Sequence, residues 1–253
     1  MGMNLFQSWQ IILPSTILQL VPAIGLCLAL AFFAWGLRAV TAAAALAGVF
    51  LTVIFCLAAG NAALLPVAAV FLLTVISTRI GRRKKERLGT AERRRGRGAL
   101  QIFANLSVAV LCAAPLLFLS HPRYILLAGA AAALAEAAGD TVSSELGQTF
   151  GQRPRLITTL QRVSPGQDGG ITVAGTLFAL AAAAIVCTAC QWADLLLPRF
   201  YPTVLSAAFF GTLVDSLLGA TLERPGRLGN NAVNFTSTAF SAAFAIAVLA
   251  LSN

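Results

Sequence analysis

Long apolar runs recur along almost the whole of this 253-residue chain and are separated by short polar links. A hydrocarbon core of roughly 30 Å requires about 20 apolar residues in a helix. This length criterion predicts eight membrane-spanning helices, at residues 17–37, 40–59, 62–78, 99–119, 124–142, 171–191, 203–222 and 232–251. With 58% hydrophobic residues, a soluble domain of this size could not bury all of its apolar side chains in one core. The expected fold is all-α: a polytopic helical bundle that forms a single integral membrane domain over residues 1–253.

The positive charges are concentrated in the link at residues 79–98. A net charge of +9 could indicate nucleic-acid binding, but basic links of membrane proteins stay on the cytoplasmic side. Placing this link inside leaves only Arg123 and Arg199 outside, in an arrangement with eight spans and both termini outside. High alanine and arginine with little lysine is typical of a GC-rich bacterial genome, so the expected location is a bacterial cytoplasmic membrane. We therefore expect membrane lipids as partners and no nucleic acid.

Carboxylates inside a predicted span are the first candidate site. A charge near the middle of a bilayer costs about 2.5–3.5 kcal/mol on insertion scales, so such residues are functional candidates. Glu136, Asp140 and Ser144 follow one another at intervals of four and share one face of a helix, with Glu145 on the next face. The stripe is either a polar seam between helices or a divalent-cation site, because carboxylates suit Mg²⁺ and commonly share it with phosphates.

The link that follows, at 146–170, contains residue types that bind phosphate. Its arginines offer forked donors to phosphoryl oxygens, and the glycine-rich turn at Pro165–Gly170 can form an anion nest from backbone N–H groups. A third polar cluster, at 215–234, follows the seventh span and lies on the same predicted face. Three clusters that are distant in sequence therefore meet at one membrane face, as a composite active site requires.

The basic link ends at Arg97, which leads into the fourth span. There Gln101 and Asn105 lie four residues apart and could face the same site. The link itself either attracts anionic lipid or nucleotide, or only holds the loop on its side of the membrane. The cysteines, including the pair Cys187 and Cys190 within a span, are interpreted as packing residues.

Five blocks carry a resemblance in their order and spacing: residues 96–105, Gly139–Gly147, Arg155–Thr159, Pro165–Thr176 and Asp215–Thr221. Together they resemble the transmembrane-protein-19 family, which includes the plant and cyanobacterial phytyl-phosphate kinases. More distantly, the blocks are similar to the CTP-dependent phytol and dolichol kinases. The family pattern often has an aspartate near Asn231, so this chain lacks one candidate metal contact.

The resemblance implies a phosphotransferase that moves a phosphoryl group from a nucleoside triphosphate, CTP by analogy, to an isoprenyl monophosphate at the cytoplasmic face. By motif, Asp140, Glu145 and Asp215 would be catalytic and would hold Mg²⁺. The predicted nucleotide- and phosphate-binding residues are Arg97, Asn105, Arg155, Thr158, Thr159, Gly166, Gly169, Gly170, Ser216, Asn230 and Asn234. An acceptor that is itself a phosphate is already anionic near neutral pH, so no strong general base is needed.

Three other functions stay open. A transporter or lipid flippase also places carboxylates within the membrane. A lipid cytidylyltransferase would use the same groups but release pyrophosphate instead of CDP. A structural membrane protein would need the carboxylates for stability alone. The sequence is compatible with a homo-oligomer.

The predicted orientation is tested by cysteine labelling. The variants Gly89→Cys and Gly166→Cys place a thiol in each of the two links that we expect on the cytoplasmic side. A membrane-impermeant maleimide should leave both thiols unlabelled in intact cells and label them after permeabilisation. Labelling of either position in intact cells would overturn the orientation.

Overall fold

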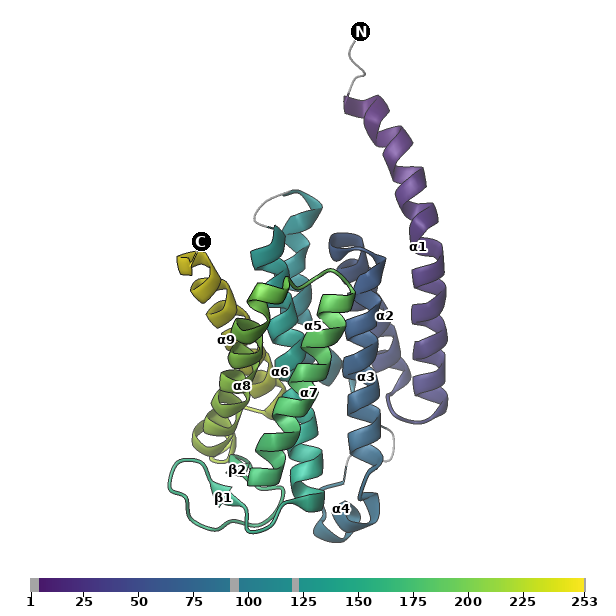
Figure 1. Ribbon diagram of the computed structural model, residues 1–253. Coiled ribbons are helices and arrows are strands. Elements are labelled where there is room, and N and C mark those ends of the chain that lie inside the picture. The colour runs from purple at the N-terminus through teal and green to yellow at the C-terminus, as the bar shows by residue number, and fades with distance from the viewer. Residues whose placement is uncertain (1–4, 92–95, 120–122, 253) are drawn as a thin grey trace.

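The computed structural model describes residues 5–91, 96–119 and 123–252, and shows long helices side by side in a bundle (Figure 1). The helices are α1 (Leu5–Gly36), α2 (Ala42–Ala59), α3 (Leu64–Arg79), α4 (Arg82–Leu88), α5 (Ala99–Ala113), α6 (Arg123–Phe150), α7 (Val173–Trp192), α8 (Tyr201–Leu218) and α9 (Asn230–Ser252). The shorter elements are 3₁₀ turns at Asn61–Ala63, Ala114–Leu117 and Pro198–Phe200, a π-helix at Gly219–Glu223, and strands β1 (Arg155–Leu156) and β2 (Gly170–Ile171).

The predicted polytopic all-α fold is confirmed. Seven helices of the described chain are long and apolar enough to cross a membrane. The expected span at 17–37 lies in α1, of which the part Val21–Gly36 forms a shorter apolar helix. The predicted link at 146–170 starts later than its sequence suggests: α6 continues to Phe150, although Gly147 and Thr149 are weak helix formers.

Helix α6 lies at the centre of the bundle. It packs against α3, α5, α7, α8 and α9. Of the 18 residues in its most apolar stretch, 83% are buried inside the protein. This is the span that contains Glu136 and Asp140, the two residues that make it the least hydrophobic of the predicted helices. Its carboxylates are compatible with a membrane because the other helices keep them away from lipid.

Small residues let the neighbouring helices come close to α6. At Gly139, an added Cβ would lie 3.2 Å from the carbonyl oxygen of Ala179 on α7. At Gly211 of α8, an added Cβ would overlap Ser241 of α9 and lie 2.6 Å from Cγ of the buried Glu136. Contacts of this kind are typical of membrane helices, which gain stability from close packing.

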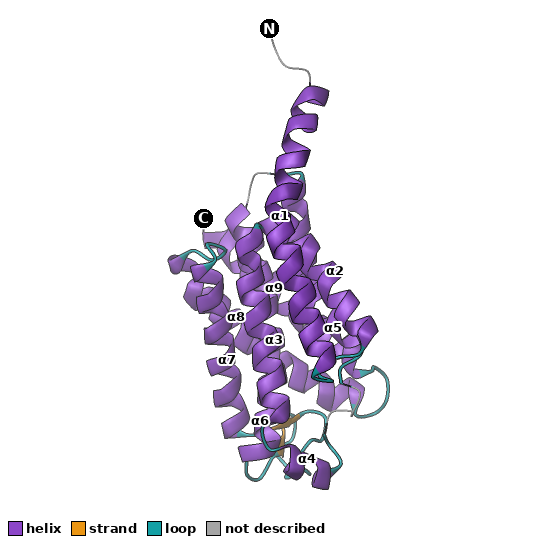
Figure 2. Ribbon diagram, turned by 90° about the vertical axis from the view of Figure 1, so that its right-hand side faces the viewer, coloured by secondary structure: helices purple, strands orange, loops and turns teal. Residues whose placement is uncertain are grey.

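The polar connections gather at one end of the bundle, which we call the loop end. It carries α4, the β1–β2 pair and the connection between α8 and α9, opposite the end where α9 finishes (Figures 1 and 2). The strands are antiparallel, with Arg155 opposite Ile171 and Leu156 opposite Gly170. The three polar clusters predicted to share one face therefore do so. Which side of the membrane this end faces stays a prediction.

The tight contact at Gly211 gives a test of the packing. Gly211→Ala should lower the free energy of unfolding by about 1–3 kcal/mol, because the methyl group has to displace Ser241 or Glu136. Gly25→Ala is the matched control, since a Cβ at that exposed position would meet nothing within 4 Å. Thermal unfolding in detergent measures both. Equal melting temperatures for the two variants would contradict the packing described here.

Candidate active site

A polar cavity of about 120 Å³ opens at the loop end. Helix α6, the 151–172 loop and the ends of α8 and α9 enclose it. Seven of the predicted site residues line it: Asp140, Gly166, Gly169, Gly170, Asp215, Ser216 and Asn230. It therefore unites the carboxylate stripe, the glycine-rich turn and the third polar cluster, which lie far apart in sequence.

Asp140 on α6 and Asp215 on α8 both line the cavity, and their carboxyl groups interact electrostatically. Ser237 of α9 donates to Oδ2 of Asp215 at 3.1 Å. Two adjacent carboxylates repel one another unless a proton or a cation lies between them. This pair is the part of the site best suited to a divalent cation.

The residues of the cavity could hold Mg²⁺ only together with water and the phosphates of a substrate. Among the described residues, no three His, Cys, Asp or Glu side chains are close enough together to hold a metal ion. Mg²⁺ is commonly held by one or two carboxylates, with water and substrate phosphates supplying its other ligands. Asp140 and Asp215 match that pattern. Glu136 lies deeper in α6, where its Oε1 is buried and has no hydrogen-bond partner in the described structure.

The glycine-rich turn is shaped by left-handed backbone. Gly166 and Gly169 have φ angles of +80° and +73°, which glycine adopts without strain. An added Cβ at Gly169 would overlap Ala220 in the π-helix, so the turn is packed directly against the end of α8. Only glycine satisfies both conditions at position 169. The turn is thereby held over the cavity that contains Asp215.

Two helices begin at this cavity. Thr172 caps α7, with its Oγ1 accepting a hydrogen bond from the Gly175 N–H at 2.9 Å, and Asn230 is the first residue of α9. Both Thr172 and Asn230 line the cavity. Helix N-termini carry unpaired N–H groups and a partial positive charge, and they favour phosphate and other anions.

Glu145 does not line the cavity but is held in a buried ion pair. Lys85 Nζ lies 2.5 Å from its Oε2, and the Lys85 side chain also donates to the carbonyl oxygens of Ser77 and Thr78. Thr78 Oγ1 donates to Oε1 of Glu145 at 3.0 Å, and the Arg97 guanidinium lies 3.6 Å from the same oxygen. In this structure Glu145 therefore anchors α4 and Arg97, and its metal-binding role stays a prediction.

The predicted phosphate contacts on β1 and its turn point elsewhere. Arg155, Thr158 and Thr159 are exposed and do not line the cavity. Arg155 Nη1 donates to the Leu160 carbonyl at 2.7 Å, and Thr159 Oγ1 accepts from the Gln161 N–H at 3.4 Å. Their arrangement stabilises the turn itself.

Asn105 and Asn234 lie in the interior of the bundle. The Asn234 amide donates to Oδ1 of Asn105 at 3.2 Å and joins α9 to α5. Neither residue lines the polar cavity, and Asn105 instead lies beside Arg97 at a second, apolar cavity. Sequence spacing placed these amides near the site but could not show that they satisfy each other.

Several residues of the cavity were not among the predicted ones. They include Ser143, Ser144 and Gln148 of α6, Asp168 and Thr172 of the loop, and Glu223 of the π-helix. The sequence did carry a signal for three of them: Ser144 belongs to the carboxylate stripe, Asp168 lies within the glycine-rich turn, and Glu223 belongs to the third polar cluster at 215–234. Lys85, which pairs with Glu145 outside the cavity, had no such signal, because it is one of many basic residues in its link.

These features define a polytopic membrane protein with a composite polar site at one end of its bundle. The family model described as integral membrane protein DUF92 matches residues 25–242, and the chain belongs to this family. The family-level resemblance carried by the motif blocks is thereby confirmed.

Relatives come from several kingdoms. An uncharacterized membrane protein of Synechocystis is 37% identical over 203 residues, which cover 78% of each chain. One from Methanocaldococcus jannaschii is 34% identical over 191 residues, or 75% of this chain and 76% of the relative. Protein VTE6, chloroplastic, of Arabidopsis thaliana is 28% identical over 198 residues, or 74% of this chain and 58% of the relative. No solved structure matches the chain significantly.

The buried ion pair predicts a large difference between two adjacent lysines. Lys85→Met should lower the free energy of unfolding by about 3–5 kcal/mol, because Glu145 loses its closest cationic partner in the interior. Lys84→Met should cost less than about 1 kcal/mol, since the Lys84 side chain is exposed. Thermal unfolding of the two purified variants measures these two losses of stability. Similar losses would show that Lys85 does not hold the cluster together.

Proposed function

We propose that this protein is a membrane phosphotransferase that moves the terminal phosphoryl group of a nucleoside triphosphate, with CTP as first candidate, to an isoprenyl monophosphate. The observation that carries the proposal is the polar cavity, which brings the Asp140–Asp215 pair, the glycine-rich turn and two helix N-termini together. The motif resemblance to phytyl-phosphate kinases and the shared family with VTE6 support it.

The proposed reaction asks for little acid–base chemistry. An oxygen of the isoprenyl phosphate forms a bond to the γ-phosphorus, the bond from that phosphorus to the β–γ bridging oxygen breaks, and the nucleoside diphosphate leaves. Phosphoryl transfer depends mainly on positioning and charge neutralisation. The acceptor is already anionic near neutral pH, so the absence of a histidine among the residues lining the cavity is no obstacle.

Each part of the cavity has a role in this proposal. The N-termini of α7 and α9, with the turn at Pro165–Gly170, offer backbone N–H groups to the nucleotide phosphates. Asp140 and Asp215 would hold Mg²⁺ together with phosphate oxygens. Bound there, the ion would neutralise charge on the transferred group. We place the site at the cytoplasmic face, where nucleotide is available.

The test is a product analysis with purified protein. Labelled CTP, Mg²⁺ and prenyl monophosphates of several lengths should yield the prenyl diphosphate and CDP. Asp140→Asn should lower kcat/KM by about 10²–10³-fold, because the site loses one of its paired carboxylates. The control is Asp194→Asn, an exposed position away from the cavity with a left-handed φ of 55°, which asparagine tolerates.

The nucleotide product separates the alternatives. Pyrophosphate in place of CDP would replace the kinase by a cytidylyltransferase. Intact nucleotide across CTP, ATP, GTP and UTP would contradict both enzymes and favour a transporter. Equal losses in Asp140→Asn and Asp194→Asn would show that the turnover does not depend on the proposed site.

A further inference from the structure

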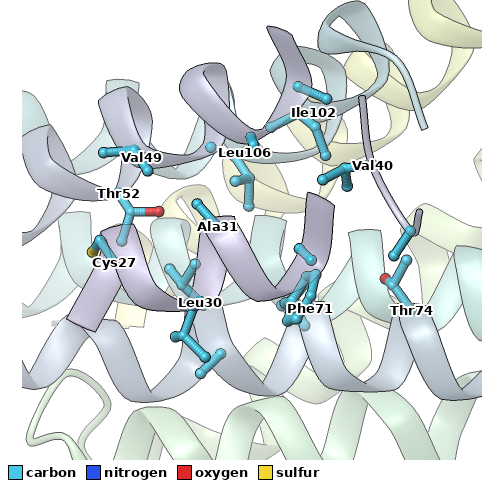
Figure 3. A pocket seen from close by; sticks show the side chains of 18 of the residues that line it. Cys27, Leu30, Ala31, Val40, Val49, Thr52, Phe71, Thr74, Ile102 and Leu106 are labelled. Carbon is cyan, nitrogen blue, oxygen red and sulfur yellow. The ribbon is translucent and has the colours of Figure 1, made fainter. Parts of the chain in front are cut away.

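A second cavity, of about 120 Å³, lies within the membrane-spanning part of the bundle, between α1, α2, α3 and α5 (Figure 3). Its walls are apolar and carry the side chains Leu30, Ala31, Val49, Phe71, Ile102 and Leu106. None of these elements contributes to the polar cavity described above. The protein therefore contains two cavities of opposite character, lined by different elements.

Small residues keep the apolar cavity open. Gly48 of α2 lines it, and a Cβ added there would meet only Cγ2 of Ile102 at 3.9 Å, an ordinary contact. Ala31 and Ala45 line the cavity from α1 and α2. An empty apolar space lowers stability because its lining atoms lose dispersion contacts. A hydrocarbon ligand from the bilayer would restore those contacts.

One end of this cavity is polar and cationic. Arg97 and Asn105 line it there, and Arg97 is fixed by backbone hydrogen bonds to Ala39 and Thr41. The Arg97 guanidinium lies 3.6 Å from Glu145, whereas Lys85 makes the closer contact to that carboxylate at 2.5 Å. Lys85 thus neutralises Glu145 at closer range, and Arg97 is the cationic side chain that lines the cavity itself.

The cationic end also adjoins the polar cavity. Arg97 interacts electrostatically with Asp140, which lines the polar cavity. Arg97 itself lines the apolar one. A molecule with an apolar tail and an anionic head would therefore place its head between the tail cavity and the carboxylate pair.

We infer that the apolar cavity binds the hydrocarbon tail of the isoprenyl monophosphate, with the phosphate at Arg97 and Asn105. This inference rests on the proposed function, to which it adds the place and direction of the lipid substrate. The tail lies among α1, α2, α3 and α5, the phosphate faces Asp140, and the nucleotide enters separately from the loop end. Charge complementarity selects this occupant over a neutral lipid, since a guanidinium pairs well with phosphate oxygens.

The test uses photolabelling rather than turnover. The probe is geranylgeranyl monophosphate with a diazirine near the end of its tail, applied to the purified full chain. Labels should map by mass spectrometry to the cavity-lining segments of α1 and α2 around Cys27 and Thr52, away from Arg97. Unmodified geranylgeranyl monophosphate should compete, and the corresponding alcohol should compete about tenfold less well because it lacks the charged head.

Matched variants on α2 test the cavity itself. Ala45→Leu and Gly48→Leu each place a larger side chain in the space and should reduce specific labelling about tenfold. Ala43→Leu adds the same side chain two residues earlier, at an exposed position that does not line the cavity, and should label like the unmodified protein. Thermal unfolding confirms that all three variants are folded, and either cavity variant suffices for the comparison.

The outcomes separate this inference from the proposed function. Labels spread over the lipid-facing surface, or equal labelling of Ala45→Leu, Gly48→Leu and Ala43→Leu, would overturn the tail site even if prenyl diphosphate is formed. Specific labelling that the two cavity variants reduce would support the tail site even if no nucleotide is consumed. In that case the phosphotransferase proposal would fail alone.

Discussion

The cost of carboxylates in a membrane governs the arrangement of this bundle. Helix α6 carries three of them, and five helices surround it so that its side chains meet protein and not lipid. Each carboxylate has a different environment. Glu145 forms an ion pair with Lys85, and Asp140 lies with Asp215 at the polar cavity. Glu136 is buried where Gly211 of α8 packs closely against it. The small residues of the neighbouring helices follow from the same need, because only close packing excludes lipid from the polar stripe.

The spans and the common end of the three polar clusters could be predicted from the sequence. Hydropathy and helix length act along the chain, and once the spans are assigned, alternate links must lie on the same side. The Asp140 and Asp215 motifs and the glycine-rich turn were found in the same way, because each is a local pattern with its own chemistry. They meet at one cavity since the bundle brings the ends of α6 and α8 together.

The remaining site residues depend on pairings that no local pattern contains. Glu145 looks like a metal ligand by motif, but its partner Lys85 belongs to a basic link where each lysine resembles the next. Asn105 has the right spacing to face the site and instead accepts a hydrogen bond from Asn234. The apolar cavity was not predicted either. It forms where small side chains on four helices leave space between them, and small residues such as Gly48 are equally common where helices pack tightly.

The contact between Lys85 and Glu145 joins positions that are 60 residues apart. A chain made from its N-terminus presents Lys85 well before α6 exists, so the ammonium group has to stay hydrated at the membrane surface until that helix has been inserted. Only then can α4 draw against the bundle and Lys85 become buried. This ion pair therefore sets an order of assembly: the N-terminal helices can complete their packing only after α6, which carries Glu145, has been inserted.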